Sequence, residues 1–263
     1  MFQEIISKNN EQLKYLRKLN NKSFRDQENA FSIEGTKLFL EAVSYQLNFR
    51  QIFVTKDWLE TNDGSVSDRL TKLSSNDVAV LVIKESLFPA ISTLQKPEGI
   101  ICILKKMSFQ TRTFKSYILL EDVQDPYNVG TIIRTADAAG IECVVTSPKT
   151  ADIYNEKVLR GSMGSVFHLP IVQADSLLDF AVQLKTNQIT LIGTSLSGIS
   201  LWDREPINEP YAIVMGNESK GMSPEMSDQC DVLLKIPIIG SAESLNVGTA
   251  AGIVIYDIVK DFK

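Results

Sequence analysis

Short apolar runs alternate with amphipathic stretches through the first hundred residues. Strands are predicted at residues 30–35, 51–55, 78–82 and 99–104, and helices at 36–45 and 84–91. Because strands and helices alternate, this region is expected to form an α/β unit. Residues 105–114 are polar and lack clear periodicity. They predict a first domain over 1–105, a linker over 106–115 and a second domain over 116–263.

The second half repeats the alternation with longer apolar runs. Strands are predicted at 117–120, 141–146, 166–171, 190–194, 211–215 and 233–238. Helices are predicted at 129–139, 155–160 and 175–185, and a last one begins near Ser244. Gly140 is a typical C-terminal helix signal, and Ser244 is a suitable N-cap. Strand–loop–helix–strand units of this kind build parallel sheets.

Composition limits the functional classes. The 263 residues are 44% hydrophobic and 22% charged, with a formal net charge of −5, so the chain is not basic throughout. No apolar run is long enough to span a bilayer, and residues 1–10 lack the apolar core of a secretory signal. The three cysteines are far apart in sequence, as expected of buried thiols in a reducing compartment. These features predict a cytoplasmic protein without a membrane segment.

Metal chemistry and histidine-dependent catalysis are not expected. The chain has one histidine, His168, within an apolar run, and no cluster of His and Cys with metal-ligand spacing. A structural role is favoured for His168, which leaves no credible Ser/His/Asp set. The phosphate-loop pattern GxxxxGK[ST] is absent, and no GxGxxG follows the first strand of either domain. The sequence therefore predicts no metal site and argues against a dinucleotide-binding fold.

A local basic face is predicted near the N-terminus. Leucines mark one face of the helical stretch 8–25, and basic residues surround it. Lys18, Lys22 and Arg25 are candidates for contact with RNA phosphates. A solvated surface without a ligand is the alternative.

Three polar loops follow apolar strands, at 125–130, 216–223 and 240–246. Ligands of parallel α/β sheets bind beyond the carboxyl ends of the strands, so these loops are the expected site. Arg134 lies in an apolar helix six residues beyond Asn128, and a charge there should be paired or face a cleft. Glu218, in the second loop, is its expected partner, and a purely structural ion pair is the alternative.

Three segments carry a resemblance to a known family. They are DPYNVGTIIRTADAAG (125–140), IVMGNESKGMS (213–223) and IPIIGSAESLNVGTAAGI (236–253). Their sequence, order and spacing resemble the three motifs of the SpoU/TrmH family, S-adenosylmethionine-dependent RNA ribose 2′-O-methyltransferases of the SPOUT superfamily. The first domain resembles the substrate-binding domain of larger members through KNNEQLKYLRKL, FSIEGTKLFLEA and KPEGI.

The resemblance implies a fold and a cofactor. A C-terminal SPOUT domain with a parallel sheet and a trefoil knot is expected, beside a smaller N-terminal α/β substrate-binding domain. S-adenosylmethionine would lie bent in the knot, and the active site would be built across the interface of a homodimer. The residues expected to contact the cofactor are Thr194, Gly216, Ile236, Ile238, Leu245 and Asn246.

The resemblance also implies catalytic residues, namely Asn128, Arg134, Glu218, Ser244 and Asn246. Arg134 is expected to orient the ribose hydroxyl and stabilise its anion, because arginine stays protonated. Asn128 and Glu218 are expected to hold the guanidinium, and Ser244 and Asn246 to position substrate or cofactor. Many relatives have a serine where this chain has Gly248, which puts a hydroxyl role there in doubt.

The predicted function is methyl transfer to a ribose 2′-hydroxyl of RNA. Ribosomal RNA is favoured by the resemblance of the first domain. A transfer-RNA 2′-O-methyltransferase and a non-catalytic RNA-binding relative are the alternatives. The non-catalytic reading predicts a damaged arginine or SLN motif, whereas both are intact. Methylation of a base nitrogen is disfavoured by the pair Asn128 and Arg134.

Overall fold

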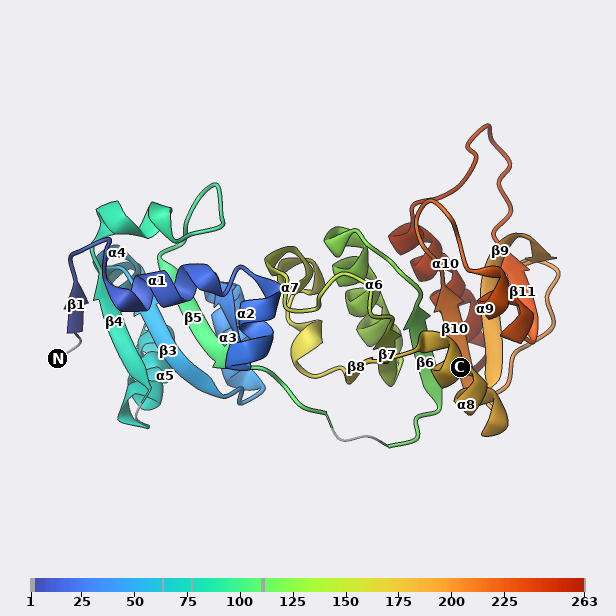
Figure 1. The fold of residues 1–263 in the computed structure, drawn as a ribbon, viewed down its shortest axis with the longest axis horizontal. Helices are drawn as coiled ribbons and strands as arrows, with labels where there is room; N and C mark the ends of the chain where they lie inside the picture. Colours follow the sequence, from blue (N-terminus) through green and yellow to red (C-terminus); the bar gives the residue numbers. More distant parts are fainter. Residues whose placement is uncertain (1–2, 63, 77, 110–111, 263) are drawn as a thin grey trace. The chain divides into compact units, whose positions relative to one another are not determined.

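The computed structural model describes residues 3–62, 64–76, 78–109 and 112–262. The chain forms two compact units (Figure 1). The N-terminal unit comprises Met1–Ser108 and Tyr154–Arg160, and the C-terminal unit comprises Phe109–Ile153 and Gly161–Lys263. The predicted boundaries at 105 and 116 stay predictions, because part of the linker lies outside the described residues.

The N-terminal unit is built on a five-stranded mixed sheet, in the order β1-β4-β3-β5-β2. β5 runs antiparallel to β2 and β3, whereas β1, β4 and β3 are parallel. Its strands are β1 (Gln3–Ile5), β2 (Ala30–Glu34), β3 (Phe49–Val54), β4 (Ala79–Ile83) and β5 (Ile100–Lys105). Its helices are α1 (Glu11–Lys18), α2 (Lys22–Glu28), α3 (Thr36–Ser44), α4 (Lys56–Thr61), α5 (Gly64–Ser75) and the 3₁₀ helix η1 (Glu85–Ala90). The predicted α/β architecture of this unit is confirmed.

The leucine pattern of the first helical stretch is explained by burial. Leu13, Leu16 and Leu19 join the core against β3, β4 and β5. The stretch is two helices rather than one, because the Asn21 side chain accepts hydrogen bonds from the N–H groups of Ser23 and Phe24 and so starts α2.

Residues far along the chain complete the N-terminal unit. The ring of Tyr154 packs against Phe31, with centroids 4.7 Å apart, and the Lys106 ammonium lies 4.8 Å from the Tyr154 ring centroid. The Met107 N–H donates to the Tyr154 hydroxyl over 3.0 Å. The sequence pattern did not predict this insertion, because nothing local marks Tyr154 as a contact of a distant strand.

The C-terminal unit is built on a six-stranded sheet in the order β11-β9-β10-β6-β7-β8, in which every pairing is parallel. Its strands are β6 (Ser116–Leu120), β7 (Cys143–Thr146), β8 (Ile171–Gln173), β9 (Thr190–Ser200), β10 (Tyr211–Met215) and β11 (Val232–Lys235). Its helices are α6 (Pro126–Ala139), α8 (Leu177–Thr186), α9 (Pro224–Gln229), α10 (Val247–Val259), η2 (Ser165–Phe167) and η3 (Lys260–Phe262); α7 (Glu156–Ser162) starts in the N-terminal unit. The predicted parallel sheet is confirmed, and the trefoil knot stays a prediction.

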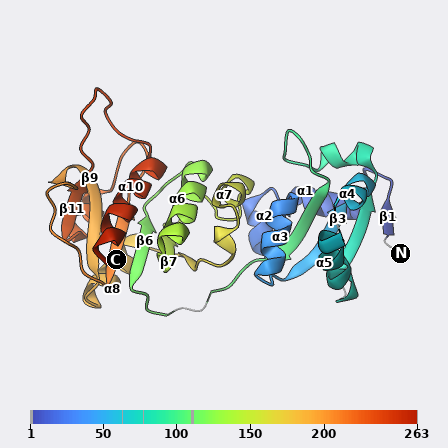
Figure 2. The ribbon, with the colours of Figure 1, turned by 180° about the vertical axis from the view of Figure 1, so that it is seen from behind.

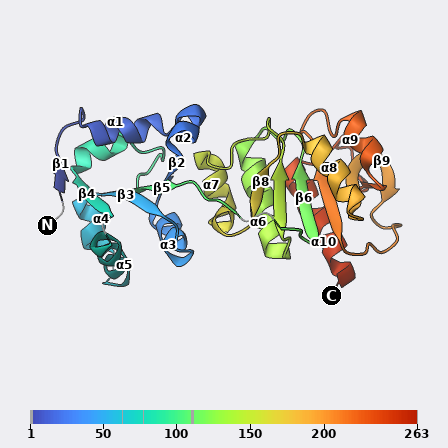
Figure 3. The same ribbon diagram turned by 60° about the horizontal axis from the view of Figure 1, so that its bottom comes forward.

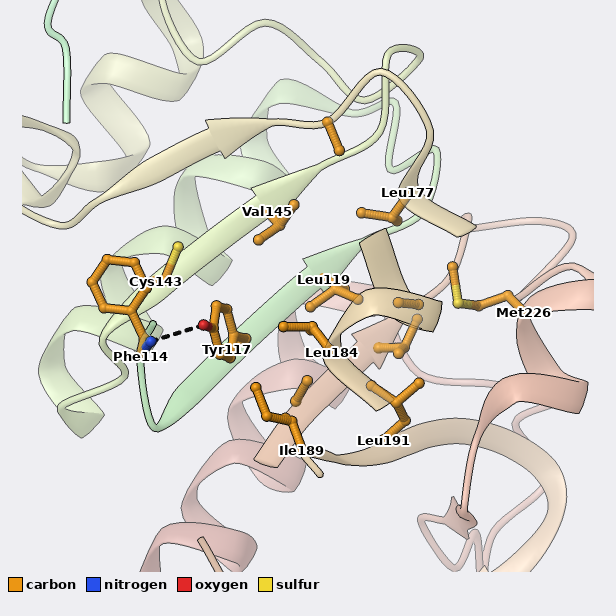
Figure 4. Close-up of a cluster of buried hydrophobic side chains, with 14 residues drawn as sticks. Phe114, Tyr117, Leu119, Cys143, Val145, Leu177, Leu184, Ile189, Leu191 and Met226 are labelled. Carbon is orange, nitrogen blue, oxygen red and sulfur yellow. Dashed lines mark hydrogen bonds between the residues drawn. The ribbon is translucent and has the colours of Figure 1, made fainter. Parts of the chain in front are cut away.

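Helices cover both faces of this sheet. Two views show α6 and α10 together on one face (Figure 2) and α8 and α9 on the other (Figure 3). Under α8 and α9, Leu119 and Val145 of the sheet pack with Leu184 and Met226 (Figure 4). The Phe114 N–H also donates to the Tyr117 hydroxyl over 2.8 Å. This packing supports the strands from which the polar loops emerge.

Most predicted elements of the C-terminal unit are present, but two strands differ from the prediction. The strand predicted over 233–238 ends at Lys235. α6 ends at Gly140, which adopts the left-handed conformation at φ 80°, as the sequence predicts. The predicted strand over 166–171 is wrong in all but its last residue. Gly164 enters a left-handed turn and η2 follows it, so that β8 starts only at Ile171. No helix in the described part of the chain is long and apolar enough to cross a membrane.

Candidate active site

The polar loops of the C-terminal unit meet at one end of its sheet. Leu120 of β6 pairs with Met215 of β10, so the segments that follow these strands emerge side by side. The chain between β11 and α10 leaves the sheet as a long loop (Figure 1). A cavity of about 520 Å³ lies among these segments. It is lined by Thr194, Ser195, Leu196, Met215, Gly216, Asn217, Glu218, Ser219, Lys220, Gly221, Met222, Ser227, Leu234, Ile236, Ile238, Glu243, Ser244, Leu245, Val247 and Ala250.

Gly216 allows two backbone segments to approach closely at the cavity. A Cβ atom at this position would lie 2.2 Å from the Met222 nitrogen and 2.3 Å from the Gly221 carbonyl carbon. Neither is a flexible side-chain end, so any larger residue must displace the loop. The required glycine explains why a backbone edge rather than a side chain faces the cavity here.

Glu218 ties the second loop to the first. Its carboxylate accepts hydrogen bonds from the Gln124 N–H at 3.1 Å, the Asp125 N–H at 2.9 Å and the Asn128 side-chain amide at 3.1 Å. Burial by itself raises the pKa of Glu218, but the hydrogen bonds outweigh it and hold the pKa below the ordinary 4.5. The carboxylate is therefore ionised at neutral pH, and it accepts its hydrogen bonds from the segment at the start of α6.

Asn128 extends this network to the third loop. Its side-chain oxygen accepts from the Asn246 amide over 2.8 Å, and the Asn246 oxygen accepts from the N–H groups of Gly248 and Thr249. Asn246 is thus the N-cap of α10, and the prediction of Ser244 as N-cap is wrong. The capping side chain must lie next to the first helical turn, and α10 begins at Val247, three residues beyond Ser244.

Arg134 is not held by the residues predicted to hold it. The side chain is exposed on α6, and among the described residues it makes no ion pair or hydrogen bond. The expected pairing with Glu218 is therefore wrong, because that carboxylate already serves backbone and amide donors. The guanidinium is free to bind an anionic group that the isolated chain does not supply.

Five of the six residues predicted to contact the cofactor line the cavity, namely Thr194, Gly216, Ile236, Ile238 and Leu245. The sixth, Asn246, instead caps α10 as described above. Ser244 lines the cavity and has no hydrogen-bond partner among the described residues. The volume is within the range of small-molecule sites, and apolar side chains mix with backbone edges around it. These features suit a flat heterocycle with a polar tail.

The sequence patterns missed two features of this site. The Ser223 N–H and hydroxyl donate to the Glu121 carboxylate, at 2.9 and 2.5 Å, and tie the second loop to the end of β6. Lys220 and Glu243 line the cavity although neither was singled out. The position of Glu121 directly after a buried strand was the available signal for the first feature.

The three residues predicted to contact RNA phosphates lie in the N-terminal unit and differ in burial. Lys18 and Lys22 are exposed; the Lys18 ammonium lies 5.6 Å from the Phe24 ring centroid, and Lys22 lies 3.7 Å from Asp26. Arg25 is only 5% exposed, and its guanidinium donates to the Leu19 and Asn20 carbonyls. The prediction of Arg25 as a phosphate contact is therefore corrected: it is a structural residue. Lys18 and Lys22 stay candidates.

The C-terminal unit, with its three joined loops, matches a known family. The SpoU rRNA Methylase family matches residues 115–256. The chain belongs to this family. Residues 10–102 match the MRM3-like substrate binding domain, in agreement with the resemblance of the first domain.

Relatives of this SpoU-family chain are similar over nearly its whole length. It is 34% identical, over 96% of this chain and 98% of the relative, to the 23S rRNA (guanosine(2553)-2′-O)-methyltransferase RlmP of Bacillus subtilis (strain 168). The structure of an AdoMet-bound rRNA methyltransferase from Sinorhizobium meliloti is 27% identical. It has a TM-score of 0.87 and covers 100% of this chain and 99% of that chain. An RNA 2′-O ribose methyltransferase structure is 25% identical, with a TM-score of 0.83, and covers 98% of this chain and 99% of that chain.

Membership of the SpoU family confirms the predicted class. The chain is an S-adenosylmethionine-dependent RNA methyltransferase with a substrate-binding N-terminal domain and an α/β catalytic domain.

Proposed function

We propose that this enzyme methylates the 2′-hydroxyl of a ribose in ribosomal RNA of the large subunit. The similarity to the 23S rRNA enzyme of Bacillus subtilis carries this proposal, since it spans both the substrate-binding and the catalytic domains. A ribosomal RNA substrate also favours the cytoplasm as its compartment.

The residues of the site divide into two groups in this proposal. Bound S-adenosylmethionine supplies an electrophilic methyl group on a sulfonium. Arg134 binds the RNA backbone and orients the ribose 2′-oxygen, because its guanidinium is exposed and has no partner among the residues that the structure describes. Glu218, Asn128 and Asn246 hold the three loops in register and do not themselves touch the reacting atoms. Ser244 lines the cavity, and its hydroxyl, which has no partner in the described part of the chain, positions cofactor or substrate.

We further propose that the enzyme acts as a homodimer through the face formed by α6 and α10. Tyr127, Ile253 and Tyr256 on these helices are 55%, 40% and 49% exposed, which is unusual for apolar side chains on two packed helices. Arg134 is exposed on the same α6. Sedimentation of the purified chain at micromolar concentration is expected to give the mass of two chains, and a single-chain mass would contradict the proposal.

Transfer of labelled methyl groups tests the proposed substrate. Protein-free ribosomal and transfer RNA from cells lacking this gene would be incubated with the enzyme and labelled S-adenosylmethionine, and then digested to nucleosides. Label in a 2′-O-methylnucleoside of 23S rRNA is the expected result.

Other outcomes of the same assay separate the alternatives. Label confined to transfer RNA would replace the proposed substrate, and label on a base would contradict ribose transfer. If naked RNA stays unlabelled, ribosomal particles from the same cells would be tested. Labelled particles would show that an assembled substrate is needed, and unlabelled particles would contradict the proposal.

A further inference from the structure

The cavity of the proposed cofactor site carries an unbalanced negative charge. Three charged side chains line it: Glu218, Glu243 and Lys220. The Glu218 carboxylate accepts hydrogen bonds from two backbone N–H groups and from the side-chain amides of Asn128 and Asn217, which fix it at the edge of the first loop. Glu243 is different, because among the described residues it makes neither an ion pair nor a hydrogen bond. Its carboxylate is thus available to a cationic ligand.

The substrate and product forms of the cofactor, S-adenosylmethionine and S-adenosylhomocysteine, differ in charge at the sulfur atom. S-adenosylmethionine carries a positive sulfonium. When the carbon–sulfur bond breaks, its electron pair stays on sulfur, and the product S-adenosylhomocysteine is a neutral thioether there. The methyl carbon bonds to the ribose oxygen, whose proton is released to solvent. A carboxylate facing the cavity therefore stabilises the substrate form of the cofactor and not the product form.

We propose that Glu243 selects S-adenosylmethionine over S-adenosylhomocysteine and so promotes release of the spent cofactor. The inference rests on the proposed function, because it assigns this cavity to the cofactor. Glu243 is exposed on the loop between β11 and α10, so solvent screens its charge. The effect is therefore moderate, about three- to tenfold in relative affinity.

Lys220 opposes this charge in the same cavity and does not cancel it. The cavity has two carboxylates and one ammonium among its described lining residues. Removing the Glu243 charge leaves Glu218 and Lys220 balanced, so the discrimination by charge is expected to disappear. The neighbouring Ser244 and Leu245 remain to contact the uncharged parts of the ligand.

Binding measured without turnover tests the inference. Isothermal titration of the wild-type enzyme and of Glu243→Gln would use S-adenosylmethionine, S-adenosylhomocysteine and sinefungin, which has a protonated amine in place of the sulfonium. Glu243→Gln is expected to weaken both cationic ligands about three- to tenfold and to change the affinity for S-adenosylhomocysteine less than twofold. In the wild type, the preference for the cationic ligands should shrink as ionic strength rises.

Glu225→Gln is the matched control. Glu225 is exposed on α9 in the same unit, does not line the cavity, and gives the same change of net charge. Equal weakening of all three ligands by Glu243→Gln, unchanged affinities, or an equal effect of Glu225→Gln would overturn the inference. Failure of the wild-type enzyme to bind any of the three ligands would instead overturn the assignment of the cavity to the cofactor.

Discussion

Replacing Arg134 with alanine is expected to lower the rate of methyl transfer about 100- to 1,000-fold. The guanidinium is exposed on α6 and makes no ion pair or hydrogen bond among the described residues, so its removal costs the fold little. Arg134 does not line the cavity, so the affinity for S-adenosylmethionine should be unchanged. Single-turnover transfer with saturating cofactor and RNA measures the rate, and calorimetry measures the affinity.

Arg134→Lys is the informative companion variant. It keeps the positive charge and loses the planar fork that binds two oxygens at once, so an intermediate rate is expected. A variant Arg134→Ala that loses cofactor binding but keeps its turnover at saturation would contradict the assigned role. Full activity in Arg134→Ala would do the same.

Gly216→Ala is expected to abolish cofactor binding and to lower the free energy of unfolding by about 3 kcal/mol. The added Cβ would lie 2.2 Å from the Met222 nitrogen and 2.3 Å from the Gly221 carbonyl carbon. Backbone atoms cannot rotate away, so the loop that carries Glu218 must move. Denaturant unfolding and calorimetric titration with S-adenosylmethionine measure the two effects.

Gly240→Ala is the control for this substitution. Gly240 lies in the neighbouring loop, and a Cβ built there meets nothing within 4 Å. Near wild-type stability and cofactor affinity are expected for Gly240→Ala. Comparable losses in both variants would mean that the close approach at Gly216 is not the cause.

Local sequence patterns predicted most of the elements and the end of α6. Burial on both faces requires near-continuous apolar strands, and this predicted the parallel sheet of the C-terminal unit. The end of α6 requires a residue with positive φ, and the glycine at position 140 predicted where the helix ends. The polar loops were also predicted from the local pattern, because polar residues directly after buried strands can lie only at the edge of the sheet.

Motif spacing identified the residues of the site but not their partners. Asn128, Glu218 and Asn246 were predicted as site residues, and the structure joins their side chains by hydrogen bonds. Arg134 was predicted as the partner of Glu218, and this prediction is wrong. Spacing cannot show that two backbone N–H groups at the start of α6 donate to the Glu218 carboxylate, or that Arg134 is left without a partner in the described part of the chain.

The sequence by itself determined the family, the two α/β domains and the loops that form the site, because these depend on local periodicity and on motifs. Only the tertiary structure decided that Arg25 is buried and donates to nearby backbone carbonyls. It also decided that Tyr154 packs against Phe31. The tertiary structure decided as well that the Glu218 carboxylate accepts hydrogen bonds, whereas the Glu243 carboxylate has no partner among the described residues. The physical reason is that burial and hydrogen-bond competition depend on residues distant in sequence, whose approach no local pattern records.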